Sequence, residues 1–105
     1  MLPLIIDLEI ISLEHIGIVE WVESNPQIMA NAVYEALEEV AAGKTDTITL
    51  IELCIGGDAQ LAIELEPADA DEPARHNEEY WVSCEDYLRA ARVRDIREYI
   101  KKKQN

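Results

Sequence analysis

The chain is poor in basic residues and in cysteine, and it lacks a long apolar run. Only nine of its 105 residues are Lys or Arg, against 22 Asp or Glu. The resulting net charge of −13 argues against direct binding to nucleic acid or to an anionic membrane. Two cysteines are too few for a disulfide scaffold and fit a reducing, cytoplasmic compartment. We expect neither a transmembrane helix nor a signal peptide, because no run of 18 apolar residues occurs and no basic segment precedes the apolar N-terminus.

The overall composition of the chain is that of a folded protein. Hydrophobic residues make up 49% of the chain and charged residues 30%, which is typical of globular rather than disordered proteins. The length predicts a single domain over residues 1–105 with one modest core.

The charge is distributed unevenly along the chain. Residues 1–88 hold 20 acids and only two bases, Lys44 and Arg75, whereas residues 89–105 hold seven bases and two acids. A strongly acidic body therefore precedes a mildly basic C-terminal segment. Such an asymmetry points to an electrostatic interaction with a partner.

Alternating or β-branched segments predict the strands. Residues 4–11 and 61–65 alternate apolar and polar positions, and residues 47–55 are apolar on both faces, as in a central strand. Gly56-Gly57-Asp58 is a turn that joins the last two into a hairpin. Residues 16–23 favour another strand, although a short helix starting at Ser12 is an alternative.

One helix is predicted over residues 26–42, where apolar residues recur at helical spacing. Asn25 can cap it, Pro26 suits its first position, and Gly43 supplies a left-handed end. A closing helix is expected from about Cys84 to Lys102, preceded by a capping box of Ser83 and Asp86. Its expected apolar side is formed by Cys84, Tyr87, Leu88, Ala91 and Tyr99, with Ile96 and Ile100 drifting off it.

The segments between these elements complete the expected fold. Residues 67–73, with two prolines and three acids, indicate a solvated loop, and residues 80–82 suggest a short edge strand. The order of elements predicts an α+β fold: a mostly antiparallel four- to five-stranded sheet with two helices packed on one face.

No arrangement of residues points to catalysis. Positions 15, 54, 76 and 84 hold the His and Cys residues, without the close pairs that a zinc site needs. Cys84 with His76 is the one candidate nucleophile and base, but the acidic surroundings favour the thiol over the reactive thiolate. The twelve-residue calcium loop and the phosphate-binding loop are also absent. We therefore expect neither an enzyme nor a bound metal or cofactor.

The acidic body itself is the feature that points to a function. Its charge is close to that of the length of duplex DNA that the domain would span, so a basic cleft that binds nucleic acid would attract it. We expect a non-enzymatic inhibitor that occupies such a site on a basic partner protein, like nucleic-acid mimics that block nucleases or defence complexes, or like immunity and antitoxin proteins. The candidate partner-binding residues are exposed acids: Glu35, Glu38, Glu39, Glu64, Glu66, Asp69, Asp71 and Glu72.

The alternative is a self-associating adaptor or structural subunit. In such a homodimer, the basic C-terminal helix of one copy would contact the acidic body of another. Trp21, Tyr80 or Trp81 would be natural anchors of that interface if they are exposed.

Overall fold

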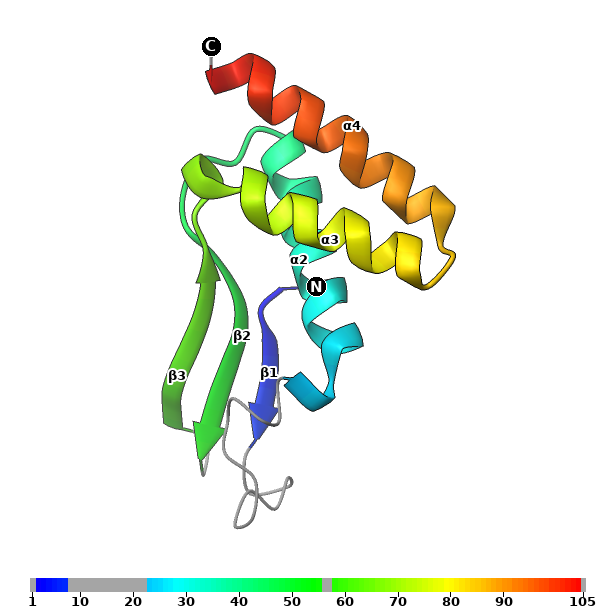
Figure 1. Cartoon of the computed structure of the whole chain (residues 1–105). Helices are drawn as coiled ribbons and strands as arrows, with labels where there is room; N and C mark the ends of the chain where they lie inside the picture. Colours follow the sequence, from blue (N-terminus) through cyan, green and yellow to red (C-terminus); the bar gives the residue numbers. More distant parts are fainter. Residues whose placement is uncertain (1, 8–22, 56–57, 105) are drawn as a thin grey trace.

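A computed structural model describes residues 2–7, 23–55 and 58–104 of the chain. Its elements in order are strand β1 (Leu4–Asp7), helix α2 (Pro26–Ala41), strands β2 (Ile48–Ile55) and β3 (Asp58–Leu65), the 3₁₀ turn η1 (Pro67–Asp69), and helices α3 (Asp71–Ser83) and α4 (Tyr87–Gln104) (Figure 1). The fold is α+β, but the expected sheet and helix count are wrong. The described residues form a three-stranded mixed sheet and three helices.

The sheet is mixed because its two strand pairs are connected differently. Strand β2 lies between the other two and pairs with β3 in the predicted antiparallel hairpin, with Ile48 opposite Leu65. Strand β1 pairs with β2 in parallel, with Leu4 beside Ile51. A parallel pair needs a long crossover, and the connection from β1 to β2 contains α2. The expected strand over residues 16–23 falls almost wholly outside the described residues.

Helix α2 confirms the prediction made from its local signals. Pro26 occupies its first turn, and Gly43 adopts a φ of 104° directly after it, donating its N–H to the Val40 carbonyl at 3.0 Å. Asn25 takes the N-cap position without a capping hydrogen bond from its side chain. The buried face consists of small and branched residues: Ala30, Ala32, Ala36, Leu37 and Val40.

The expected loop at 67–73 and edge strand at 80–82 are both wrong. Residues 67–69 form η1, and everything from Asp71 to Ser83 is helical. Prolines are tolerated in the first turn of a helix, where the missing N–H has no helical partner, and Pro73 lies there. Asp71 and Glu72 in the same turn are favourable beside the positive end of the helix dipole.

The start and the buried face of the closing helix also differ from expectation. Ser83 ends α3, and Asp86 takes the capping role for α4, accepting a hydrogen bond from the Arg89 N–H at 3.2 Å. The residues that α4 buries are Ala90, Val93, Ile96 and Ile100. The expected apolar positions Cys84, Tyr87 and Leu88 are exposed.

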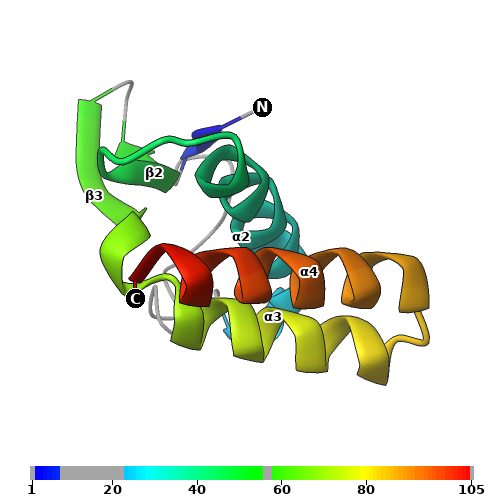
Figure 2. The same ribbon diagram turned by 90° about the horizontal axis from the view of Figure 1, so that it is seen from above.

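Helix α2 lies between the sheet and the antiparallel α3–α4 pair, and all three helices are on one side of the sheet (Figure 2). Buried Asn77 of α3 joins two of these helices and supports a buried indole. Its amide donates to the Ala30 carbonyl of α2 at 3.0 Å and accepts from the Trp81 indole N–H at 2.9 Å. None of the described helices is long and apolar enough to cross a membrane.

Candidate functional site

Positive charge is confined to the helices and to one loop of this fold. All nine Lys and Arg residues belong to described parts of the chain: Lys44 follows α2, Arg75 lies in α3, and the other seven lie in α4. Strands β1, β2 and β3 hold no base but contain Asp7, Glu52, Asp58 and Glu64. The described strands therefore carry only negative charge, whereas the α3–α4 layer, residues 71–104, holds eight bases and eight acids.

Strand register places the glutamates of the sheet on its outer face. On the inner face Ile51 and Leu53 are buried in the core. Ile51 pairs with Ile63, which packs against the core, and Leu53 pairs with Leu61, which is 46% exposed. The alternate positions point outward, since successive strand residues face opposite sides. They pair Glu52 with Ala62 and Glu64 with Thr49.

This outer face continues past the end of β3. Glu66 is exposed and accepts a hydrogen bond from the Thr47 hydroxyl at 2.6 Å, which fixes its carboxylate beside the start of β2. Asp46 and Asp69, both exposed, flank the same end of the hairpin. Alternate residues of a strand are about 6.6 Å apart, close to two phosphate steps of about 3.4 Å along one DNA strand. We call Asp46, Glu52, Glu64, Glu66 and Asp69 the sheet acidic face.

The three predicted glutamates of α2 are not part of this face. Glu38 accepts two hydrogen bonds from the Arg92 guanidinium of α4, at 2.6 and 3.0 Å. The hydrogen bond from Arg92 is the largest of the effects that hold the pKa of Glu38 below its usual value. Glu39 lies 3.4 Å from the Lys44 ammonium, and Glu35 lines a groove beside Leu4 of β1. Glu38 and Glu39 therefore pair with cations of their own chain.

Asp71 and Glu72 likewise belong to the helical layer. An Asp71 carboxylate oxygen lies 3.7 Å from Nε of Arg97, whose guanidinium also donates to Glu78 at 3.0 Å. Glu72 lies 3.6 Å from both Arg75 and His76 on its own helix. Arginines of the basic C-terminal helix therefore form ion pairs with some of the acids of their own chain.

Of the eight predicted acids, Glu64 lies on the outer face of β3, Glu66 and Asp69 follow beyond its end, and the other five lie on α2 and α3. Sequence reasoning missed Glu52, because β2 was interpreted as apolar on both faces. The sequence held no signal for it: uninterrupted pairing from Ile55 and Asp58 would put Glu52 opposite Leu61, on the inner face. A register shift between Leu53 and Cys54 instead places Glu52 opposite Ala62, on the side of Glu64.

The candidate nucleophile and base do not meet. His76 lies within α3 and Cys84 at its C-terminal end, eight residues or about 12 Å along the helix axis. Cys84 therefore ends one helix and does not begin the next. Within residues 2–7, 23–55 and 58–104 no group of three or more His, Cys, Asp or Glu side chains is arranged to hold a metal ion.

Comparison with protein-family models, with curated proteins and with solved structures gave no match to this chain.

Proposed function

We propose that this protein is a non-enzymatic inhibitor that places its sheet acidic face in a basic, nucleic-acid-binding site of a partner protein. The observation that carries the proposal is the segregation of charge: the strands hold acids and no base, while eight of the nine bases lie in α3 and α4, on the opposite side of α2, and only Lys44 lies in the loop before β2. A partner's cationic cleft would meet carboxylates there without an interleaved Lys or Arg to repel it.

The physical basis is attraction at a distance followed by charge pairing. A surface of one sign steers an oppositely charged partner and raises the association rate, most strongly at low ionic strength. The strand backbone of the hairpin already fixes the spacing of the carboxylates, so binding has to order only their side chains. Binding would exclude nucleic acid from the same cleft by occupying it.

The test compares two charge-reversal variants with equal net charge. Glu52→Lys with Glu64→Lys alters the sheet acidic face, and Glu85→Lys with Glu98→Lys alters exposed acids of the α3–α4 layer. Wild-type protein serves as bait for basic proteins in a lysate of the organism that encodes it, and captured protein is eluted with duplex DNA. Affinity for the captured partner is then measured for each variant.

We expect the sheet variant to lose at least tenfold in affinity and the control variant to stay within about threefold of wild type. Wild-type protein should also inhibit DNA binding by the partner. Equal losses in both variants would mean that net charge alone drives the binding. A partner that duplex DNA does not displace would exclude a shared site.

A second candidate is a self-associating adaptor, and the exposed tip of the α3–α4 pair favours it. Val82, Tyr87 and Leu88 lie together in sequence around the turn, and their exposed fractions are 48%, 62% and 87%. Arg92 and Arg97 already pair with acids of their own chain, which leaves the lysines at 101–103 for an acidic face of a second copy.

Light scattering measures the oligomeric state and so tests this candidate. Leu88→Lys and deletion of residues 101–105 should each dissociate such a dimer. A monomeric wild type would exclude it.

A further inference from the structure

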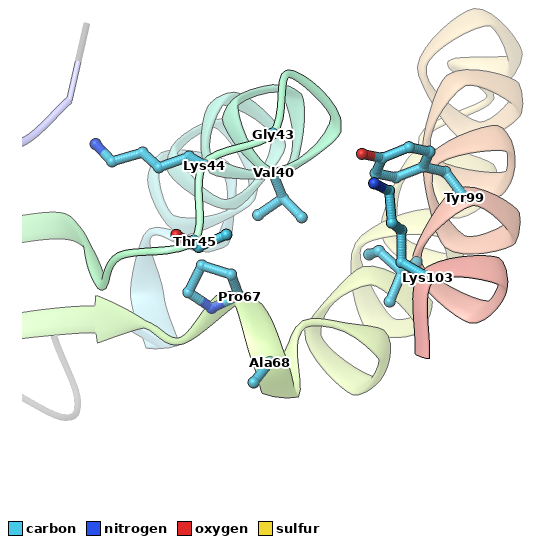
Figure 3. A pocket seen from close by; sticks show the side chains of 9 residues that line it. Val40, Gly43, Lys44, Thr45, Pro67, Ala68, Tyr99 and Lys103 are labelled. Atoms are coloured by element: carbon cyan, nitrogen blue, oxygen red, sulfur yellow. The ribbon is translucent and has the colours of Figure 1, made fainter. Parts of the chain in front are cut away.

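A small cleft lies between the C-terminal end of α2, the loop before β2, η1 and the last turns of α4. Its volume is about 280 Å³, and its lining is mostly apolar. Val40 of α2 and Pro67 of η1 line it (Figure 3), and Ile100 lines it from α4. Gly43 borders it and would have open space around a side chain, so the cleft is not closed by the helix end.

Two polar groups of α4 face this apolar lining. Figure 3 shows the Tyr99 hydroxyl and the Lys103 ammonium turned toward the cavity, while Lys44 extends away from it. The Lys103 ammonium lies 5.6 Å from the centre of the Tyr99 ring. Among the residues that the structure describes, no carboxylate lies within ion-pairing distance of Lys103, although Lys44 pairs with Glu39.

We propose that this cleft binds a small amphiphilic carboxylate, a monocarboxylic acid with a compact apolar body. Lys103 and Tyr99 would donate to its carboxylate, and Val40, Pro67 and Ile100 would cover its hydrocarbon part. This pattern of an apolar pocket with a few convergent polar groups is the usual form of a small-molecule site. At about 30 Å³ for each water-sized unit, the cleft accommodates roughly nine or ten non-hydrogen atoms.

The charge around the cleft suits an anion despite the acidity of the whole chain. Lys101, Lys102 and Lys103 end α4, and Lys44 follows α2, so four of the nine bases lie at this end of the molecule. The lining of the cleft holds two lysines and no acid, although Asp46, Glu66 and Asp69 of the sheet acidic face each adjoin a lining residue in sequence. The inference uses none of those carboxylates, so it does not depend on the proposed inhibitor function.

The experiment uses octanoate, which has ten non-hydrogen atoms, with octanamide and acetate as matched probes. Octanamide keeps the apolar chain without the charge, and acetate keeps the charge without the chain. Each is titrated into ¹⁵N-labelled full-length protein, and amide chemical shifts are followed by NMR. We expect saturable shifts with octanoate at residues such as Gly43 and Ala68, with a dissociation constant in the millimolar range or below.

Two variants distinguish octanoate binding in the cleft from nonspecific attraction of the anion to lysine side chains. Lys103→Gln should weaken octanoate binding at least fivefold and leave octanamide binding unchanged, while Lys102→Gln, outside the cleft lining, should bind octanoate like wild type. Unchanged thermal unfolding of both variants would show that the fold is retained. Absence of saturable shifts, equal affinity for octanoate and octanamide, or equal losses in the two variants would each overturn the proposal.

Discussion

At the scale of single residues, the charged Glu38 carboxylate joins two helices. It holds the Arg92 guanidinium with two hydrogen bonds, and so ties α2 to α4. Tyr34 lies beside the pair: its pKa is raised, first by burial and then by the negative charge of Glu38. Tyr34 also makes a T-shaped contact with Trp81 of α3, at 6.0 Å between ring centres. The contact between α2 and α4 therefore extends to α3.

The lowered pKa of Glu38 makes the pair sensitive to pH. A carboxylate with a lower pKa in the folded than in the unfolded state adds stability above its unfolded pKa, and this is lost as pH falls through its folded pKa. We expect Glu38→Gln to lower the free energy of unfolding by about 0.5–1 kcal/mol at pH 7, because the pair is partly exposed. At acid pH, once the folded pKa of Glu38 has been passed, the difference should vanish, since Glu38 is then protonated in both states.

Denaturant unfolding of wild type, Glu38→Gln, Arg92→Gln and the double variant at both pH values measures this effect. The coupling energy between positions 38 and 92 should be present at pH 7 and absent at low pH. A loss in Glu38→Gln that stays the same at low pH would instead assign the role of Glu38 to packing.

At the scale of elements, the end of α2 depends on a single glycine. Gly43 has a φ of 104°, which side chains rarely adopt, and no atom lies within 4 Å of the position that a Cβ would take. We therefore expect Gly43→Ala to destabilise the protein by about 1 kcal/mol through backbone strain alone. Gly43→Asn should lose less, because Asn tolerates positive φ better than Ala. Thermal unfolding of the two variants checks this order, and an Ala variant as stable as wild type would contradict the left-handed helix end.

Elements with local signals could be predicted from the sequence. Pro26, the apolar spacing and Gly43 mark α2 without reference to any other part of the chain, and two glycines mark the β2–β3 hairpin. Its alternation also identified Glu64 and Glu66 as outward-facing carboxylates. Such features need only neighbours in sequence, so the pattern determines them.

Elements that depend on distant contacts could not be predicted. The prolines and acids of residues 67–73 resemble a loop, and α3 is secured by burying Ala74 and Trp81 and by bonding Asn77 to α2. The parallel direction of β1 has no local signal in four residues. The dispersal of Glu38 and Asp71 away from the candidate site likewise follows from arginines that lie 54 and 26 positions later in the chain.

At the scale of the whole molecule, the fold places acids on the sheet, where most of them form no ion pair with a described Lys or Arg. Glu52 and Glu64 lie on the same face of adjacent strands, and like charges on neighbouring strands repel. The arginines of α4 instead pair with acids of the helical layer. If the sheet acidic face serves a partner, the free protein bears a cost in stability there.

Neutralising this face should therefore stabilise the protein. We expect Glu52→Gln with Glu64→Gln to raise the free energy of unfolding by about 0.5–1 kcal/mol at low ionic strength, by relieving cross-strand repulsion. Added salt should narrow the difference, because it screens the same repulsion in wild type. Glu79→Gln is the matched control: Glu79 lies 3.3 Å from Arg75, so its removal should not stabilise. Thermal unfolding at about 0.02 and 0.5 M salt gives both quantities. A sheet variant less stable than wild type would mean that these carboxylates are held by favourable contacts, and the trade of stability for partner binding would have to be abandoned.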